Sequence, residues 1–194
     1  MRFLPGLICL LPLLSPLAHA ELIDDVNDRG ELRIAIEANT PPFNFKKDDT
    51  LEGFEVELGQ MLANELDVRA DFVVTDSNDL LTGVESGKYD IAINHITETP
   101  ALKDRFDFSE PYIRTGVQLI AQKDEPQSML LVQSLTENKP KASSPVNLAI
   151  PFQKGNPAFH ASLENALQRI KADGRLQALE EKWFGEESGV MPKQ

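Results

Sequence analysis

The chain has 194 residues, a length that fits one domain or two small ones. Apolar residues make up 41% and charged residues 26%, which excludes a chain that is disordered throughout. Lys and Arg number 19 against 31 Asp and Glu, so the formal net charge is -12. Because binding to nucleic acid needs positive surface, we expect no nucleic acid as partner, but a small solute or a protein.

The first twenty residues, 1–20, have the pattern of a secretory signal peptide. Arg2 gives a positive start, a Leu-rich apolar run covers residues 3–17, and residues 18–20 supply small residues for signal peptidase. The run is shorter than the roughly 20 apolar residues of a membrane-spanning helix, and no later stretch is apolar enough, so we expect no membrane insertion. The only cysteine, Cys9, lies inside this signal. The mature chain is therefore expected in the periplasm, without disulfides.

Strand and helix patterns alternate along the first half of the mature chain. Apolar residues alternate over 32–36 and predict a strand, and their spacing over 54–66 fits one face of a helix. A second strand is expected at 70–74, a short helix at 76–85, and a third strand at 89–94 that is apolar on both faces. Strands separated by helices predict crossover connections and parallel pairing.

The second half adds two strands to this pattern. Thr99 followed by Pro100 is typical of a helix cap and first turn. We expect a fourth strand at 116–121 and a fifth at 147–150. The predicted fold class is therefore α/β, an open, mainly parallel five-stranded sheet with helices on both faces.

Residues 122–146 break the alternation, with three prolines, four serines and mixed charge. We interpret this segment as a linker, which is long for a compact domain. Helical spacing resumes over 156–173 and 176–184, and each of these helices ends at a glycine. Residues 186–194 are expected to form a flexible tail.

Two segments are placed where an open parallel sheet binds its ligands, beyond the carboxyl ends of the strands. They are residues 37–40, after the first strand, and residues 94–99, after the third. The hydroxyls of Thr97 and Thr99, with free backbone N–H groups near a helix start, could hold an anion such as a carboxylate. The alternative is that they cap the next helix, for which one of them suffices.

Other kinds of chemistry have less support in the sequence. His95 and His160 are the only histidines after the signal, and their spacing matches no metal motif. No serine lies in a nucleophile elbow and no glycine-rich phosphate loop follows a strand, so we expect no cofactor and no catalytic residue. Glu37 near His95 could form an acid–base pair, although nothing local demands it.

Seven short motifs occur in order along the mature chain, and together they resemble a known family. They are Gly30–Ile36, Pro41–Phe45, Gly53–Leu58, Ser86–Asp90, Thr97–Pro100, Phe106–Tyr112, and Ala172–Gly174 with Glu181–Gly185. The set resembles family 3 of the periplasmic solute-binding proteins, the polar amino-acid receptors of ATP-driven importers. The resemblance covers residues 22–121 and 147–185.

The resemblance implies a fold of two α/β lobes joined by two crossing strands, with the solute trapped when the lobes close. Residues 21–121 and 147–185 would form lobe 1 of such a type II binding protein. The second lobe should lie between these two pieces, where only the linker at 122–146 is present. A sheet with flanking helices cannot be built from so few residues, so we expect a single lobe with the second lobe missing.

The pocket residues that the resemblance implies are partly replaced in this chain. Thr40 stands where the family has an aromatic side chain that stacks on the solute, and Ser77 stands where a second aromatic wall is frequent. The family's arginine, which grips the α-carboxylate of the solute, is replaced by Leu102. Arg105 lies three residues later and is not expected to substitute. The strongest orienting contact of the lobe is therefore expected to be lost.

Three further residues complete the degenerate pocket. His95 replaces a small residue, and its bulk is expected to intrude on the solute. Glu37 matches the acidic residue that can meet an α-amino group, and Thr97 is retained. About half of a binding site remains.

Three functions stay open at this point. The first is a binding module without high-affinity amino-acid binding, which acts through a protein partner such as a permease or a sensor. The second is a genuine importer receptor for a small polar amino acid or a related solute. An enzyme is the third, and it is disfavoured because no catalytic domain is appended and the lobe that would enclose an active site is missing. A gene product that folds but has lost its role also fits the sequence.

Overall fold

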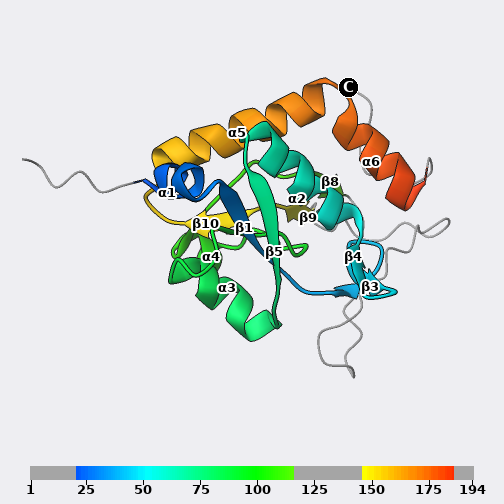
Figure 1. Cartoon of the computed structure of the whole chain (residues 1–194), viewed down its shortest axis with the longest axis horizontal. Coiled ribbons are helices and arrows are strands. Elements are labelled where there is room, and N and C mark those ends of the chain that lie inside the picture. Colours follow the sequence, from blue (N-terminus) through cyan, green and yellow to red (C-terminus); the bar gives the residue numbers. More distant parts are fainter. Residues whose placement is uncertain (1–20, 116–145, 186–194) are drawn as a thin grey trace, which may run out of the picture.

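The structure is a computed structural model, and it describes residues 21–115 and 146–185. A five-stranded sheet forms its centre (Figure 1). In order across the sheet, the strands are β5 (Arg69–Val74), β1 (Glu31–Ile36), β6 (Ile91–Ala92), β10 (Pro151–Gln153) and β7 (Phe106–Phe108). β1 is parallel to β5 and β6, whereas β10 is antiparallel to β6 and β7. The predicted α/β class and the mainly parallel five-stranded sheet are confirmed.

Helices cover both faces of this sheet, as predicted (Figure 1). One face carries α1 (Leu22–Arg29), α2 (Phe54–Glu65), α5 (Pro157–Ala172) and α6 (Arg175–Phe184), and the other carries α3 (Ser77–Glu85) and α4 (Pro100–Lys103). The side chains of β1 explain why helices cover both faces. Leu32 and Ile34 pack into the core under the first group of helices, whereas Ala35 packs with Leu80 and Val84 of α3. Successive side chains of a strand point to opposite faces, so both faces of β1 are buried.

The longest helix, α5, buries the apolar face that its sequence spacing predicts. Its buried residues are Phe159, Leu163, Ala166, Leu167 and Ile170. They pack into the same core as the buried side chains of α2 and α6. Within residues 21–115 and 146–185, no helix is both long enough and apolar enough to cross a membrane.

A second, three-stranded sheet follows β1 and was not predicted. It consists of β2 (Asn39–Thr40), β3 (Asn44–Lys47) and β4 (Thr50–Glu52), paired antiparallel. Gly53, at the end of β4, has a φ of 134°, and a Cβ atom there would lie 2.2 Å from the carbonyl oxygen of Phe43. Only glycine therefore allows the start of α2 to approach β3 this closely.

The prediction of a fifth strand at 147–150 is wrong for the main sheet. β9 (Val146–Leu148) pairs antiparallel with β8 (Ile113–Thr115) in a separate two-stranded sheet. At Ala149 and Ile150 the chain leaves that ladder, because their N–H groups donate to the carbonyl of Ile96 and to Oγ of Ser109. β10 and β7 complete the main sheet instead, and neither was predicted as a strand.

Four expectations concern residues outside those that the structure describes. They are the signal peptide at 1–20, the fourth strand at 116–121, nearly all of the linker at 122–146, and the tail at 186–194.

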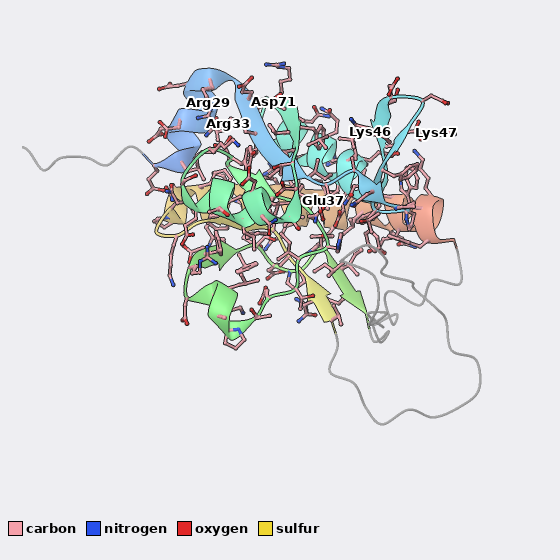
Figure 2. All side chains as sticks on the ribbon, turned by 90° about the horizontal axis from the view of Figure 1, so that it is seen from below. Arg29, Arg33, Glu37, Lys46, Lys47 and Asp71 are labelled. Carbon is pink, nitrogen blue, oxygen red and sulfur yellow. The ribbon has the colours of Figure 1, made fainter. Side chains whose placement is uncertain are left out.

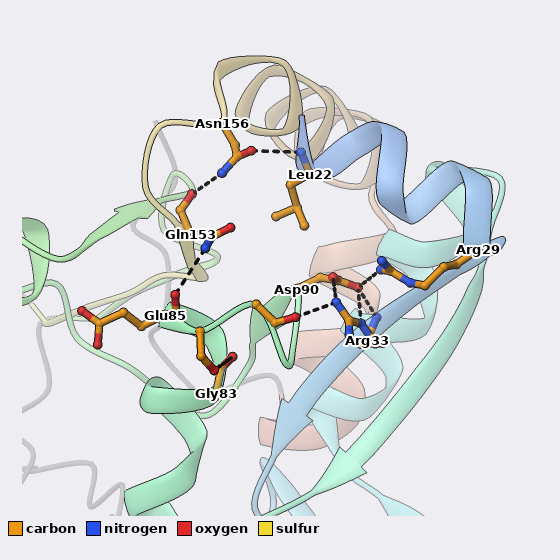
Figure 3. A network of polar contacts seen from close by, with 10 residues as sticks. Leu22, Arg29, Arg33, Gly83, Glu85, Asp90, Gln153 and Asn156 are labelled. Atoms are coloured by element: carbon orange, nitrogen blue, oxygen red, sulfur yellow. Dashed lines mark hydrogen bonds and ion pairs between the residues drawn. The ribbon is translucent and has the colours of Figure 1, made fainter. Parts of the chain in front are cut away.

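A buried carboxylate ties the beginning of the chain to the sheet (Figure 3). Asp90, just before β6, has a fully buried side chain and pairs with Arg29 at 2.6 Å and with Arg33 at 2.7 Å. It also accepts a hydrogen bond from the backbone N–H of Arg33. Asn156 adds a second tie, since its Oδ1 accepts from the N–H of Leu22 at 2.9 Å. Together these contacts fix α1 against the start of β1 and of α5.

Candidate functional site

The carboxyl ends of β1 and β6 meet at one edge of the sheet, which we call the crevice edge. Glu37 follows β1 and Asn94 follows β6. The backbone N–H of Glu37 donates to Oδ1 of Asn94 at 3.1 Å, and Nδ2 of Asn94 donates to Oε2 of Glu37 at 2.8 Å. The structure thus brings together the two segments selected from the sequence. In Figure 2, Glu37 lies near the centre of the view, whereas Lys46 and Lys47 lie out on the β3–β4 hairpin.

A buried polar network, absent from the sequence analysis, continues inward from this pair. Nδ2 of Asn44, at the start of β3, donates to Oδ1 of Asn94 at 3.1 Å and to Oε2 of Glu55 at 2.6 Å. Asn44 and Glu55 are both fully buried. Glu55 lies in the first turn of α2, where the partial positive charge of the helix N-terminus favours a carboxylate.

The other carboxylate oxygen of Glu55 reaches two further segments. Oε1 accepts from the hydroxyl of Tyr112, just before β8, at 2.6 Å, and from the backbone N–H of His95. Burial raises the pKa of the Tyr112 phenol well above its ordinary value, and the nearby Glu55 carboxylate adds to this. Glu55 therefore joins four segments: the start of α2, β3, the chain after β6, and the chain entering β8.

His95 lies against the interior of this network. Its φ is 41°, a left-handed conformation that is uncommon outside glycine. Its ring centroid is 5.8 Å from that of Phe43, and Nδ1 is 3.9 Å from Oε2 of Glu55. Nδ1 is buried and has no hydrogen-bond partner among the described residues. In the described part of the chain, no hydrogen bond or ion pair joins His95 to Glu37, so the acidic neighbour of the histidine is Glu55.

The threonine segment after β6 separates into two roles. Oγ1 of Thr99 accepts from the N–H of Leu102 at 3.3 Å and caps α4. Thr97 forms an isolated antiparallel bridge with Leu148, the last residue of β9. Thr99 alone therefore caps the helix, which agrees with the alternative that one threonine suffices for capping. Leu102 is partly buried and packs against the core on the α3 face.

The remaining predicted positions make their contacts outside this network. Thr40 is buried, and its hydroxyl donates to Oδ1 of Asn39 at 3.0 Å. Ser77 is exposed as the first residue of α3, after Asp76, whose side chain caps the helix. Arg105 donates from both Nε and Nη2 to Glu85.

The charge of the crevice edge is negative. Among the residues that the structure describes, no Lys or Arg side chain forms an ion pair or a hydrogen bond with Glu37 or Glu55. The described residues also contain no group of three or more His, Cys, Asp or Glu side chains that could hold a metal ion. Glu37 and Glu55 therefore offer carboxylate oxygens that no Lys or Arg of the described residues neutralises by direct pairing.

Comparison with known proteins identifies relatives across most of the chain. The family model "Bacterial extracellular solute-binding proteins, family 3" matches residues 32–186. The L-cystine-binding protein TcyJ of Escherichia coli (strain K12) is 26% identical over 233 residues, covering 87% of this chain and 88% of the relative. The arginine-binding extracellular protein ArtP of Bacillus subtilis (strain 168) is 28% identical over 154 residues, covering 75% and 58%. The aligned stretch of TcyJ is longer than this whole chain, so the relative has internal residues that this chain lacks.

Solved structures show the same fold at low sequence identity. The L-cystine solute receptor of Neisseria gonorrhoeae, in its unliganded open conformation, has a TM-score of 0.70 at 23% identity and covers 89% of this chain and 100% of its own. A variant of the arginine-bound form of domain 1 from TmArgBP has a TM-score of 0.59 at 22% identity, covering 77% and 98%. Likeness at this level concerns the fold.

Proposed function

Because the chain belongs to family 3 of the bacterial extracellular solute-binding proteins, we propose that it is a one-lobed periplasmic module that has lost high-affinity amino-acid binding. It acts instead through a protein partner such as a permease or a sensor. The observation that carries this proposal is that, in the described chain, no Lys or Arg side chain pairs with Glu37 or Glu55 and position 102 holds a leucine.

The length of the chain supports a single lobe. β8 and β9 pair as neighbouring strands, and only residues 116–145 lie between them in the sequence. A lobe with its own sheet and helices needs far more residues, because each parallel crossover alone takes a dozen or more. The longer aligned stretch of the cystine-binding relative agrees with a deletion within the chain.

The side chains at the edge support the loss of amino-acid binding. Leu102, where the family resemblance places an arginine, packs into the core on the α3 face. Arg105, three residues later, is paired with Glu85. Without a guanidinium, a solute carboxylate would lose its charge-assisted contact and would face the carboxylate of Glu37.

The partner contact is expected to be polar. Val74 is the only large hydrophobic side chain that is exposed among the described residues. Large apolar patches mark many stable interfaces, and their scarcity here points to a transient contact. With a formal net charge of -12, the chain favours a partner that presents basic groups.

Calorimetry of the mature chain with a panel of amino acids tests the binding claim. We expect no amino acid to bind in the micromolar range, and micromolar binding of any of them would contradict the proposal. The Leu102→Arg variant should gain measurable affinity because it restores the cation that the family resemblance places at this position. Ala101→Arg, which adds the same charge at an exposed neighbouring position, should not.

Photo-crosslinking in the periplasm tests the partner claim. A photoreactive amino acid at the position of Ser77 samples the crevice edge, because α3 follows the carboxyl end of β5. The same group at Asp28 samples the opposite edge, where α1 leads into β1. One specific protein crosslinked from Ser77 and not from Asp28 is expected. No specific product from Ser77 would contradict the module.

A genuine receptor remains the second candidate, because a solved structure of similar fold is the arginine-bound form of one domain. The structure of domain 1 from TmArgBP is described as its arginine-bound form. A missing second lobe is therefore no barrier by itself, and the replaced side chains carry the argument against binding. The calorimetric panel separates the two candidates.

A further inference from the structure

Two side-chain amides link the buried network to Glu37, and each is held in one orientation by its hydrogen bonds. Glu55 accepts from Asn44, Asn44 donates to Asn94, and Asn94 donates to Glu37. We propose that Glu55 is a positioning residue of the crevice edge, which fixes the orientation of both amides and thereby holds the carboxylate of Glu37 in place. The inference rests on the proposed function in one respect, that the crevice edge is where a ligand would bind.

Glu55 is the inner end of this series of hydrogen bonds, because its side chain is the acceptor in each of its own. Its two oxygens receive the hydroxyl of Tyr112, the N–H of His95 and the amide of Asn44. Three donors surround this one buried carboxyl group, so both of its oxygens serve as acceptors. Asn44 must consequently turn its NH2 group, and not its oxygen, toward Glu55.

The orientation of Asn44 depends on this contact. Its Oδ1 is buried and has no hydrogen-bond partner among the described residues, so the oxygen does not hold the amide in place. Both of its fixed contacts come from Nδ2, one to Glu55 and one to Asn94. The acceptor at position 55 therefore decides which end of the amide faces Asn94.

Asn94 transmits the orientation to the crevice edge. Its Oδ1 accepts from Nδ2 of Asn44 and from the backbone N–H of Glu37. With the oxygen turned inward, Nδ2 is left to donate to Oε2 of Glu37 at 2.8 Å. Glu37 is thus held at its backbone and at its carboxylate by one amide whose direction is set by Glu55.

A glutamine at position 55 separates positioning from simple packing. The side chain has nearly the same shape, and its Oε1 could still accept from Tyr112 and His95. Its NH2 group, however, would oppose the NH2 of Asn44. Asn44 can relieve this only by turning over, which places its Oδ1 against Oδ1 of Asn94. The mismatch must therefore reach Asn94.

The test uses the isotope-labelled mature chain and NMR signals of the Asn94 side-chain amide and the Glu37 carboxyl group. Glu55→Gln should move both signals while the chain stays folded. Glu57→Gln is the matched control, since Glu57 lies in the same helical turn and contacts Lys182 and Trp183. Unchanged signals in folded Glu55→Gln would overturn the proposal.

A second variant covers the case in which Glu55→Gln does not fold. Asn44→Ala keeps the Glu55 carboxylate and removes the link to Asn94. It should move the same two signals, and their constancy in this variant would equally overturn the proposal.

Binding provides a readout that packing alone would not change. In the Leu102→Arg background, Glu55→Gln should weaken amino-acid affinity about tenfold or more, and Glu57→Gln should not. Unchanged affinity would overturn the positioning role. If Leu102→Arg binds no amino acid, the proposed function fails on that point, and the NMR comparison alone decides the role of Glu55.

Discussion

Arg105 donates from Nε and Nη2 to the carboxylate of Glu85, at the end of α3, and its guanidinium lies 5.1 Å from the ring centroid of Phe106. Both contacts are on the α3 side of the sheet. A cation three residues from the lost arginine is therefore already paired, and the crevice edge gains no positive charge from it.

Removal of this arginine should leave the chemistry of the crevice edge unchanged. In the Leu102→Arg background, Arg105→Ala is expected to keep the amino-acid affinity within about twofold, a difference of less than half a kcal/mol. Calorimetry on the two variants measures this. A marked loss of affinity on removal of Arg105 would mean that it contacts the solute.

Asp90→Asn should destabilise the fold because it removes the charge that two arginines share. Arg29 and Arg33 keep about a quarter to a third of their side-chain surface exposed, while Asp90 has none. Breaking a buried ion pair from one side costs roughly 3 to 5 kcal/mol, and partial hydration of the arginines brings the expected loss to about 2 to 3 kcal/mol. Urea unfolding followed by Trp183 fluorescence measures it.

Asp28→Asn is the control for that experiment, since Asp28 lies exposed on α1. It should change the free energy of unfolding by less than about 0.5 kcal/mol. Equal effects of the two substitutions would show that the Asp90 network contributes nothing beyond general charge.

The sequence predicted the elements whose apolar spacing continues over two or more turns or over a whole strand. The helix expected at 54–66 is α2, and the strand expected at 32–36 is β1. The three-residue strands β7 and β10 were not predicted, because so few residues show no periodicity. Residues 147–150 are apolar enough for a strand, but only residues up to 148 belong to β9. The hydrogen bonds of Ala149 and Ile150 to other segments end that strand before β10 begins.

The site was predictable where the topology of the sheet decides it. Parallel strands end at a common edge, so Glu37 and the segment after β6 could be placed together from the sequence. Asn44 and Glu55 could not, because a polar residue near a turn or in the first turn of a helix is ordinarily exposed. Only the close approach of the chain at Gly53 buries them together, and Gly53 followed by Phe54 was the available signal.

Gly53→Ala should lower the free energy of unfolding by more than backbone strain alone would, because the new side chain also clashes with a neighbouring backbone oxygen. The new Cβ would lie 2.2 Å from a backbone oxygen, at a φ that residues with side chains rarely adopt. We expect a loss of about 3 kcal/mol or more, since such strain costs roughly 1 to 3 kcal/mol before the clash is counted. Denaturant unfolding measures it, and the crevice edge should be disturbed as β3 moves away from α2.

Gly87→Ala is the matched comparison. Its φ is 75°, also in the left-handed region, but nothing lies within 4 Å of an added Cβ. The expected loss is about 1 to 2 kcal/mol, from conformation alone. If both variants lose the same stability, the contact with Phe43 does not matter.

Glu180 gives the fold a dependence on pH. Burial in α6 raises the pKa of its carboxyl group from 4.5 to about 7, the charge of Glu181 adds to the shift, and Lys171 opposes it. Oε1 is buried and has no hydrogen-bond partner among the described residues. In the unfolded chain the group loses its proton near pH 4.5, whereas the folded chain keeps it until about pH 7. The stability associated with Glu180 is therefore present below pH 4.5 and is lost as the pH rises to about 7.

Glu180→Gln removes this dependence. The variant should be more stable than the parent by about 2 kcal/mol at pH 8, and the difference should vanish near pH 4. Denaturant unfolding of both proteins at several pH values gives the difference directly. Glu181→Gln, at the exposed neighbouring position, should show a smaller effect, because it only lessens the repulsion on Glu180. A gain for Glu180→Gln that is the same at pH 4 and pH 8 would mean that the ionised carboxylate of Glu180 does not destabilise the fold.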